Sequence, residues 1–246
     1  MRSLIKADMQ RILKKPGFWI FSLLIILLSC FAFRIRMSPA DGLRGFHFLS
    51  FSVDIFAASA IFFGFLIFSV VYCDEFRSMA FITVLGKGMD RLKLVLAKLI
   101  DTVILTTLLF TLLGIAGIVT SLLMGANMNS HEIGLFIYSL CSDAAETLIS
   151  MSLASVFIYI TEKIPVSIFV LLILKLVSAV VAMLNGSARD ILERLYFTEI
   201  LRNAWTELVL GAAGKSVFTL IFCLICYLAI CVGAIHFTFG RKELSF

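Results

Sequence analysis

Long runs of apolar residues recur along the chain, and they constrain its fold more than any other feature. A helix needs about 20 apolar residues to cross the hydrocarbon core of a bilayer. Six segments reach or approach that length, and we expect each to be a transmembrane helix: Phe18–Phe33, Phe51–Tyr72, Leu99–Met124, Gly134–Ile160, Val166–Leu184 and Ser216–Phe239. With 61% hydrophobic and 15% charged residues, the chain is too apolar for a soluble domain. It therefore predicts an all-α integral membrane protein with one transmembrane domain over residues 1–246.

Basic residues are distributed unevenly between the two sets of connecting segments, and this asymmetry predicts the orientation. Thirteen Lys and Arg residues lie at the N-terminus, after the second and fourth spans and in the C-terminal tail, against seven on the other face. Basic residues close to span ends stay on the cytoplasmic side of the membrane. We therefore expect both termini to be cytoplasmic.

Residues 1–16 predict an amphipathic helix ahead of the first span. One helical face collects the apolar side chains, namely Leu4, Ile5, Met9, Ile12 and Leu13. Basic residues fill the other face, as in helices that lie in the membrane interface. Pro16-Gly17 ends this helix. The alternative is a solvated basic tail.

A compact charged segment, residues 73–98, separates the second and third spans. Its first part has a helical pattern, Gly86 and Gly88 permit a sharp turn, and Asp90 is a plausible N-cap for the helix that enters the third span. The segment therefore predicts a helix, a glycine turn and a second helix at the cytoplasmic face. Two interpretations remain open: a docking surface for a cytoplasmic partner, or a basic loop that only fixes the topology.

Two stretches of the chain, "LIKADMQRILKKPGFWI" and "DEFRSMAFITVLGKGMDRLKLVLAKLI", resemble ABC-2-type permeases, the membrane subunits of ATP-driven exporters. The resemblance extends over essentially the whole length. In the second stretch it rests on an acidic residue after span two, a glycine, a basic residue and an Ala-Lys pair, here Glu75, Gly86 or Gly88, Arg91 and Ala97-Lys98. It implies that residues 73–98 form a coupling helix that docks on an ATPase, with Glu75, Phe76, Met79, Gly86, Gly88 and Arg91 as the coupling residues.

The same resemblance implies the partners. ATP and Mg would be bound by a separate ATPase subunit, so this chain would be neither an enzyme nor a cofactor-binding protein. A second permease protomer, identical or a sister subunit, would complete a dimer in the lipid of a prokaryotic plasma membrane. The cargo would be an amphipathic peptide such as a bacteriocin, lantibiotic or phenol-soluble modulin, with lipids or drugs as the runner-up. Nucleic acid is not expected as a partner.

Charged residues within the spans are candidate functional groups, because they are costly in lipid and usually face the bundle interior. Lys175 lies near the middle of the fifth span, and Glu146 and Asp143 lie on the antiparallel fourth span. They form either a structural ion pair between Lys175 and Glu146 or part of a translocation path. Asp54 and Asp101 lie nearer the span ends and are expected to be better solvated.

Two further features predict a path and its gate. The second span is rich in Phe, and Phe62, Phe63, Phe65 and Phe68 either line an apolar path or face lipid. Residues 187–213 form an extracellular segment with helical spacing, expected to lie on the outer surface or dip into it. ABC-2 permeases carry re-entrant outer helices at this place, which makes Leu195 and Trp205 the candidate outer gate.

Motifs for other chemistry are incomplete. "VLGAAGKS" has Val209 where a P-loop needs its first glycine, and "HEIGL" has Leu135 where a zinc protease needs its second His. The "CLIC" cysteines, Cys223 and Cys226, have no second ligand pair nearby. We therefore predict no catalytic or metal site, and an intramembrane enzyme or a secondary transporter remains the rival class.

Overall fold

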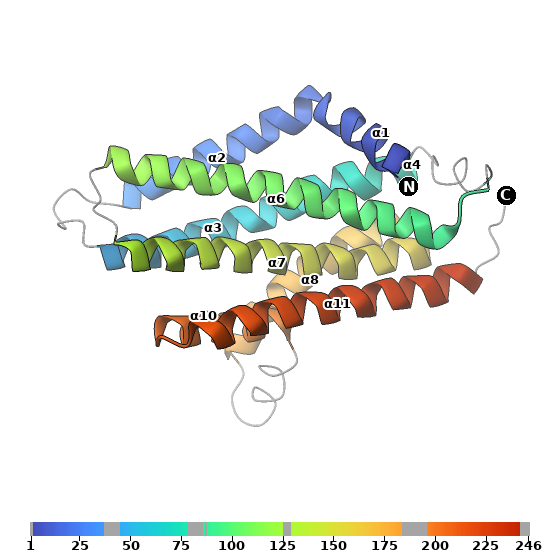
Figure 1. Cartoon of the computed structure of the whole chain (residues 1–246). Coiled ribbons are helices and arrows are strands. Elements are labelled where there is room, and N and C mark those ends of the chain that lie inside the picture. Colours follow the sequence, from blue (N-terminus) through green and yellow to red (C-terminus); the bar gives the residue numbers. More distant parts are fainter. Residues whose placement is uncertain are drawn as a thin grey trace.

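The computed structural model describes residues 2–36, 45–77, 86, 88–124, 129–183 and 196–241. Within these ranges the chain is helical apart from short turns, which confirms the all-α prediction (Figure 1). The elements are α1 Arg2–Leu13, α2 Pro16–Arg36, α3 Gly45–Phe68, η1 Ser69–Cys73, α4 Asp74–Arg77, α6 Arg91–Leu123, α7 Ser130–Thr161, α8 Ile164–Met183, α10 Phe197–Val209 and α11 Ala213–Arg241.

Several helices are long and apolar enough to cross a membrane. In the described residues four qualify alone: Ala57–Arg77, Arg91–Leu123, Ser130–Thr161 and Ala213–Thr238. The bent pair α1 and α2 gives a fifth if it is counted as one span, and the apolar stretch Ile164–Leu174 of α8 is shorter. At 1.5 Å per residue, α6 and α7 are roughly 50 Å long, so both extend beyond a hydrocarbon core of about 30 Å. The multi-pass membrane character is thus confirmed, while the count of six spans stays a prediction.

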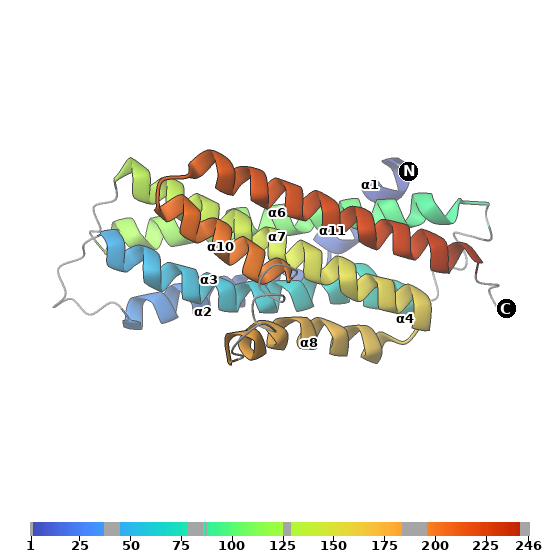
Figure 2. The same cartoon turned by 90° about the horizontal axis from the view of Figure 1, so that it is seen from below.

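The helices form an elongated bundle around α7. This helix packs against α3, α6, α8, α10 and α11, and α2 packs against α3 and α6. Figures 1 and 2 show the long helices running along the same axis, with the start of α1 and the end of α11 at one end of the bundle. We refer to this as the terminal end of the bundle.

The exterior of the bundle is apolar, as expected for a surface that faces lipid. Large apolar side chains of α2, α6 and α11 stand exposed, among them Phe21, Leu27, Leu123 and Phe218. A soluble protein seldom exposes so continuous an apolar surface. Hydroxyl groups within the helices, including those of Ser22, Thr111, Thr147 and Thr238, donate to the carbonyl one turn earlier. This satisfies a polar group without water, which the hydrocarbon core requires.

The predicted N-terminal helix is present as α1, and its place in the membrane interface stays a prediction. It ends before Pro16, and the chain turns by 67° into α2. The indole Nε1 of Trp19 donates to the carbonyl of Leu13 at 2.8 Å, which ties the first turns of α2 to the end of α1. Of its apolar residues, Ile12 is fully buried, and Leu4 and Met9 pack against the same core.

A π-helical turn, η1, joins α3 to α4. Its signature is the amide of Asp74, which donates to the carbonyl of Ser69 five residues earlier. Such a turn inserts about one residue into the helix and so rotates the residues after it by about 100° around the helix axis. The short α4 consequently continues the helix with Glu75 and Phe76 turned toward the interior, where both are buried.

At the end opposite α1, α10 lies alongside α11 and α7 and extends along part of the bundle's length (Figure 2). Phe197 and Leu201 of α10 are buried against Ala145, Ile149 and Cys223. Gly211, with φ +94°, turns the chain from α10 into α11. The sequence predicted a helix on the outer surface or dipping into it, and α10 packs into the bundle.

Candidate functional site

The most concentrated set of buried charges lies at the terminal end of the bundle and centres on Lys98. This residue is on α6, two turns from its start, and is only 1% exposed. Its Nζ lies 2.7 Å from Asp8 Oδ2 of α1 and 2.5 Å from Glu75 Oε2 of α4. One ammonium group therefore binds three separate elements together.

Further ion pairs reinforce this arrangement. Arg11 reaches back to Asp8 at 3.5 Å, and the Lys15 ammonium pairs with Asp74 at the start of α4. The Lys15 and Asp74 side chains are both partly exposed, so their pair contributes less than the buried one. Together the contacts fix α1 across the beginnings of α4 and α6. We call Asp8, Glu75 and Lys98 the Lys98 cluster.

The Lys98 cluster is costly to assemble and costly to break. Moving charges out of water is unfavourable unless each charge finds close partners. Here Lys98 uses two of its three N–H donors on carboxylates of residues that are themselves 8% and 6% exposed. Removing the ammonium would leave two buried carboxylates without their shared cation. The cluster therefore specifies one arrangement of α1, α4 and α6.

Asp101 lies one turn beyond Lys98 and contradicts the expectation of easy solvation. Its side chain is 0% exposed, and in the described part of the chain neither carboxyl oxygen has a hydrogen-bond partner. The neighbouring hydroxyl of Thr102 donates instead to the Lys98 carbonyl at 2.8 Å and lies 3.4 Å from the Tyr72 hydroxyl. The prediction was wrong because the packing of other helices around the first turns of α6 encloses a residue that hydropathy places near a span end.

The predicted coupling segment is only partly within the described residues. Asp90 is the N-cap of α6, as predicted, and accepts from the amide of Leu92 at 3.3 Å. Gly88 has φ +83°, a backbone conformation that favours glycine, and Arg91 begins α6. Gly86 is exposed. Met79 lies outside the described residues.

Phe76 does not face outward as a docking residue would. Its side chain is 9% exposed, and its ring meets Tyr159 of α7 edge-on at 5.4 Å between centroids. Because that contact is internal, Phe76 anchors α4 to the bundle. The role of Phe76 in docking a partner stays a prediction.

The intramembrane polar groups fall on the expected helices. Asp143 and Glu146 lie on α7 and Lys175 on α8, two helices that pack together. The side chain of Lys175 lies outside the described residues, so the ion pair with Glu146 stays a prediction. The Tyr196 hydroxyl donates to the Leu174 carbonyl. Burial raises the pKa of Tyr196 to about 12, and the nearby charge of Glu146 adds to the rise.

The four Phe residues predicted to line a path divide into two pairs. Phe63 and Phe68 are at most 1% exposed, and they pack against Phe110 and Tyr72 in the core. They pack in the core of the protomer, so a role for them in a path stays a prediction. Phe62 and Phe65 border an open groove between α2 and α3 of about 700 Å³.

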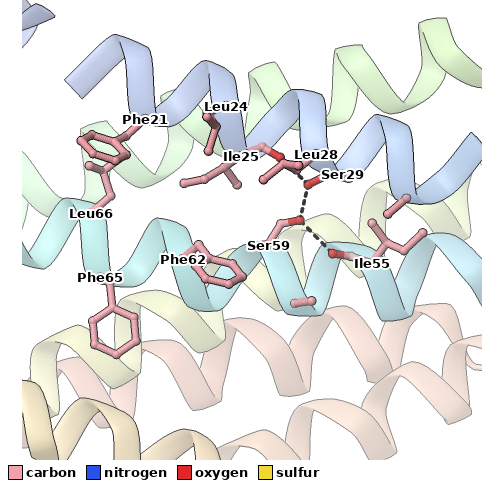
Figure 3. A pocket seen from close by; sticks show the side chains of 12 residues that line it. Phe21, Leu24, Ile25, Leu28, Ser29, Ile55, Ser59, Phe62, Phe65 and Leu66 are labelled. Carbon is pink, nitrogen blue, oxygen red and sulfur yellow. Dashed lines mark hydrogen bonds between the residues drawn. The ribbon is translucent and has the colours of Figure 1, made fainter. Parts of the chain in front are cut away.

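Figure 3 shows this groove, which is apolar apart from one polar contact. The hydroxyls of Ser29 and Ser59 lie 2.6 Å apart where α2 and α3 cross. Each hydroxyl also lies within hydrogen-bond distance of a carbonyl of its own helix, Ser29 of Ile25 and Ser59 of Ile55, so one serine donates to its own helix while the other donates across the pair. The serine pair therefore joins the two helices and leaves the remaining wall to apolar side chains.

The candidate outer gate is described in part. Trp205 is half-buried on α10, and Leu195 lies outside the described residues. Glu199 of the same helix is 0% exposed and pairs with Arg202 one turn later. The buried face of α10, with Phe197 and Leu201, holds this helix against α7 and α11.

No family model, curated protein or solved structure matches this chain. Among the residues that the structure describes, no three His, Cys, Asp or Glu side chains are placed to share a metal ion.

Sequence reasoning missed the Lys98 cluster as a contact, although one signal was present. Asp8 is one turn from both Leu4 and Ile12, so it lies on the apolar face of the amphipathic helix. A buried acidic residue is either paired with a cation or protonated, so Asp8 on the apolar face indicated a buried partner or a bound proton. The charge count that predicted the orientation included Lys98 only as one of thirteen basic residues, so it gave no indication that Lys98 is buried and paired.

Proposed function

We propose that the chain is the membrane permease subunit of an ATP-driven exporter similar to the ABC-2 type. The observation that carries this proposal is the buried contact between Glu75 and Lys98 at 2.5 Å. These are the acidic residue after the second span and the lysine of the Ala-Lys pair on which the resemblance rests. Their contact closes the base of the segment between α4 and α6, where such a permease would meet its ATPase.

This contact suits the transmission of force. A partner that moves the segment would act on α4 and α6 together, because Lys98 holds both, and on α1 through Asp8. The π-helical turn passes the motion from α4 into α3 without a loop between them. Displacement at the terminal end would therefore reach helices that extend along the whole bundle.

The transported molecule in this proposal is an amphipathic peptide, passing between two protomers. Phe62 and Phe65 offer apolar surface, Asp143 and Glu146 lie deeper in α7, and α10 is the candidate gate at the opposite end. Lipid export is the second candidate, because the groove between α2 and α3 is lined almost wholly by apolar side chains, as an acyl chain would need. Both versions place the termini in the cytoplasm of a prokaryotic cell.

Purification from native membranes tests the proposal. The tagged chain should co-purify with an ATPase, and vesicles that contain both should move a fluorescent amphipathic peptide or lipid only when ATP is hydrolysed. A partner with an inactivated ATP site is the matched control. Transport that persists with that control, or that follows an ion gradient, would instead identify a secondary transporter. Purification without any ATPase would reject the exporter.

A further inference from the structure

The charges buried around Lys98 do not balance. Three carboxyl groups, those of Asp8, Glu75 and Asp101, belong to residues that are 8%, 6% and 0% exposed, and they share one ammonium group whose residue is 1% exposed. The Arg11 guanidinium, 3.5 Å from Asp8, adds a second cation: two of its nitrogens are buried, although the side chain as a whole is 37% exposed, so three carboxyl groups face two cations. Lys98 is in contact with Asp8 and Glu75, which leaves Asp101 as the third acid.

Asp101 lacks what an ionised carboxylate needs. Neither of its oxygens has a hydrogen-bond donor among the described residues, and the adjacent Thr102 hydroxyl points to other acceptors. A buried charge without donors or a close counter-ion is strongly unfavourable, whereas a neutral carboxylic acid is tolerated. The charged side chains close enough to act on Asp101 are Lys98 on α6, Asp8 and Arg11 on α1, and Glu75 on α4. Two further titratable groups lie in the same region: the Tyr72 hydroxyl of η1 and, next to it, the Cys231 thiol of α11.

The Lys98 ammonium is also within reach of the Asp101 carboxyl group. They are three residues apart on α6, so their side chains lie on the same face of the helix. In this structure the Lys98 ammonium turns toward Asp8 and Glu75. A lysine side chain has a flexible four-carbon stem and can change partners by rotating about it.

We infer that Asp101 is a proton-binding site and the second acceptor for the Lys98 ammonium. While Lys98 holds α1 and α4, Asp101 carries a proton. When α1 and α4 separate from α6, water reaches Asp8 and Glu75, which remain ionised. Lys98 keeps its own proton and pairs with Asp101, whose proton passes to water. One proton is thus released for each protomer that opens, whatever the protein transports.

The direction of the pH dependence comes from this proton balance. The closed arrangement binds one more proton than the open one, so acid favours closure and alkali favours opening. Asp101→Asn keeps the size of the side chain and cannot release a proton. That variant should remain closed at a pH that opens the wild-type protein.

Infrared spectroscopy of the full-length protein in lipid vesicles tests the protonated state directly. The wild-type protein should show the carbonyl band of a buried carboxylic acid, which Asp101→Asn removes and the exposed N-cap variant Asp90→Asn retains. If Asp101→Asn does not fold, Asp101→Thr replaces it, and the same carbonyl band should be missing from its spectrum. Absence of the band in the wild-type protein, or its full persistence in a folded Asp101 variant, overturns the proposal.

Distance measurements test the coupling. Spin labels at exposed Gln10 on α1 and Lys93 on α6 report whether the two helices are together. Raising the pH should increase the population with the longer distance in the wild-type background and leave Asp101→Asn in the short-distance population. An unchanged wild-type distribution across the pH range, or an equal response in Asp101→Asn, rejects the exchange of partners.

Discussion

The Lys98 ammonium of α6 lies 2.7 Å from the Asp8 carboxylate of α1, and both groups are buried. This contact places a helix that precedes the first span against the beginning of the third. The α1 helix is therefore an integral part of the bundle, held by a charge pair as well as by its apolar face. The attachment of α1 depends on Lys98, which also contacts Glu75 at the base of the proposed coupling segment.

Lys98→Met should destabilise the protein strongly. The variant leaves Asp8 and Glu75 buried without their shared cation, a change that typically costs about 3–5 kcal/mol. Thermal unfolding in detergent micelles measures the loss. The triple variant with Asp8→Asn and Glu75→Gln should recover a large part of it, because neither carboxylate of the cluster is then left buried without Lys98. Equal destabilisation in the single and triple variants would show that charge pairing is not the cause.

Gly114→Leu should destabilise the contact between α6 and α7. A Cβ at Gly114 would come within 2.7 Å of Leu140 Cδ1, so a leucine side chain there forces Leu140 to move. Overpacking of this kind typically costs about 1–3 kcal/mol. Gly134→Leu on α7 is the matched control, since nothing lies within 4 Å of its Cβ position. Similar unfolding temperatures for the two variants would contradict the close approach of α6 and α7.

Much of this architecture could be predicted from the sequence. Hydropathy identified long apolar helices, and the Pro16-Gly17 break and the Asp90 N-cap are local signals that the structure confirms. Burial of single residues was harder, because it depends on which helices pack together. Phe62 is 61% exposed and Phe63 is 0% exposed, although hydropathy treats them alike. Asp101 was misjudged for the same reason.

Lys175→Met should destabilise the protein if Glu146 neutralises Lys175 across α7 and α8. The single variant would leave an unpaired carboxylate within the bundle or force it to take up a proton. Adding Glu146→Gln should restore much of the lost stability, which detergent unfolding can measure. Losses that simply add in the double variant would mean that the two groups do not interact.

Cysteines placed at Leu195 or Trp205 should change their labelling rate when ATP is trapped on the partner ATPase. The expectation comes from the proposed role of the outer segment as a gate that moves during ATP-driven export. A thiol reagent that does not cross the membrane provides the measurement, and a cysteine at exposed Val217 on α11 is the control. Labelling that is the same in every nucleotide state would exclude a gate at this position.

Phe62→Ala and Phe63→Ala should separate transport from stability. Phe63 is fully buried against Phe110, so its truncation removes core packing and typically costs about 3–5 kcal/mol. Phe62 borders the groove between α2 and α3 and stands exposed, so its truncation should leave the unfolding temperature nearly unchanged. If cargo uses this groove, Phe62→Ala should nevertheless slow ATP-driven movement of an amphipathic peptide or lipid into vesicles. Wild-type transport by Phe62→Ala, at equal protein content, would place the path away from the groove and leave its Phe side chains as lipid-facing surface.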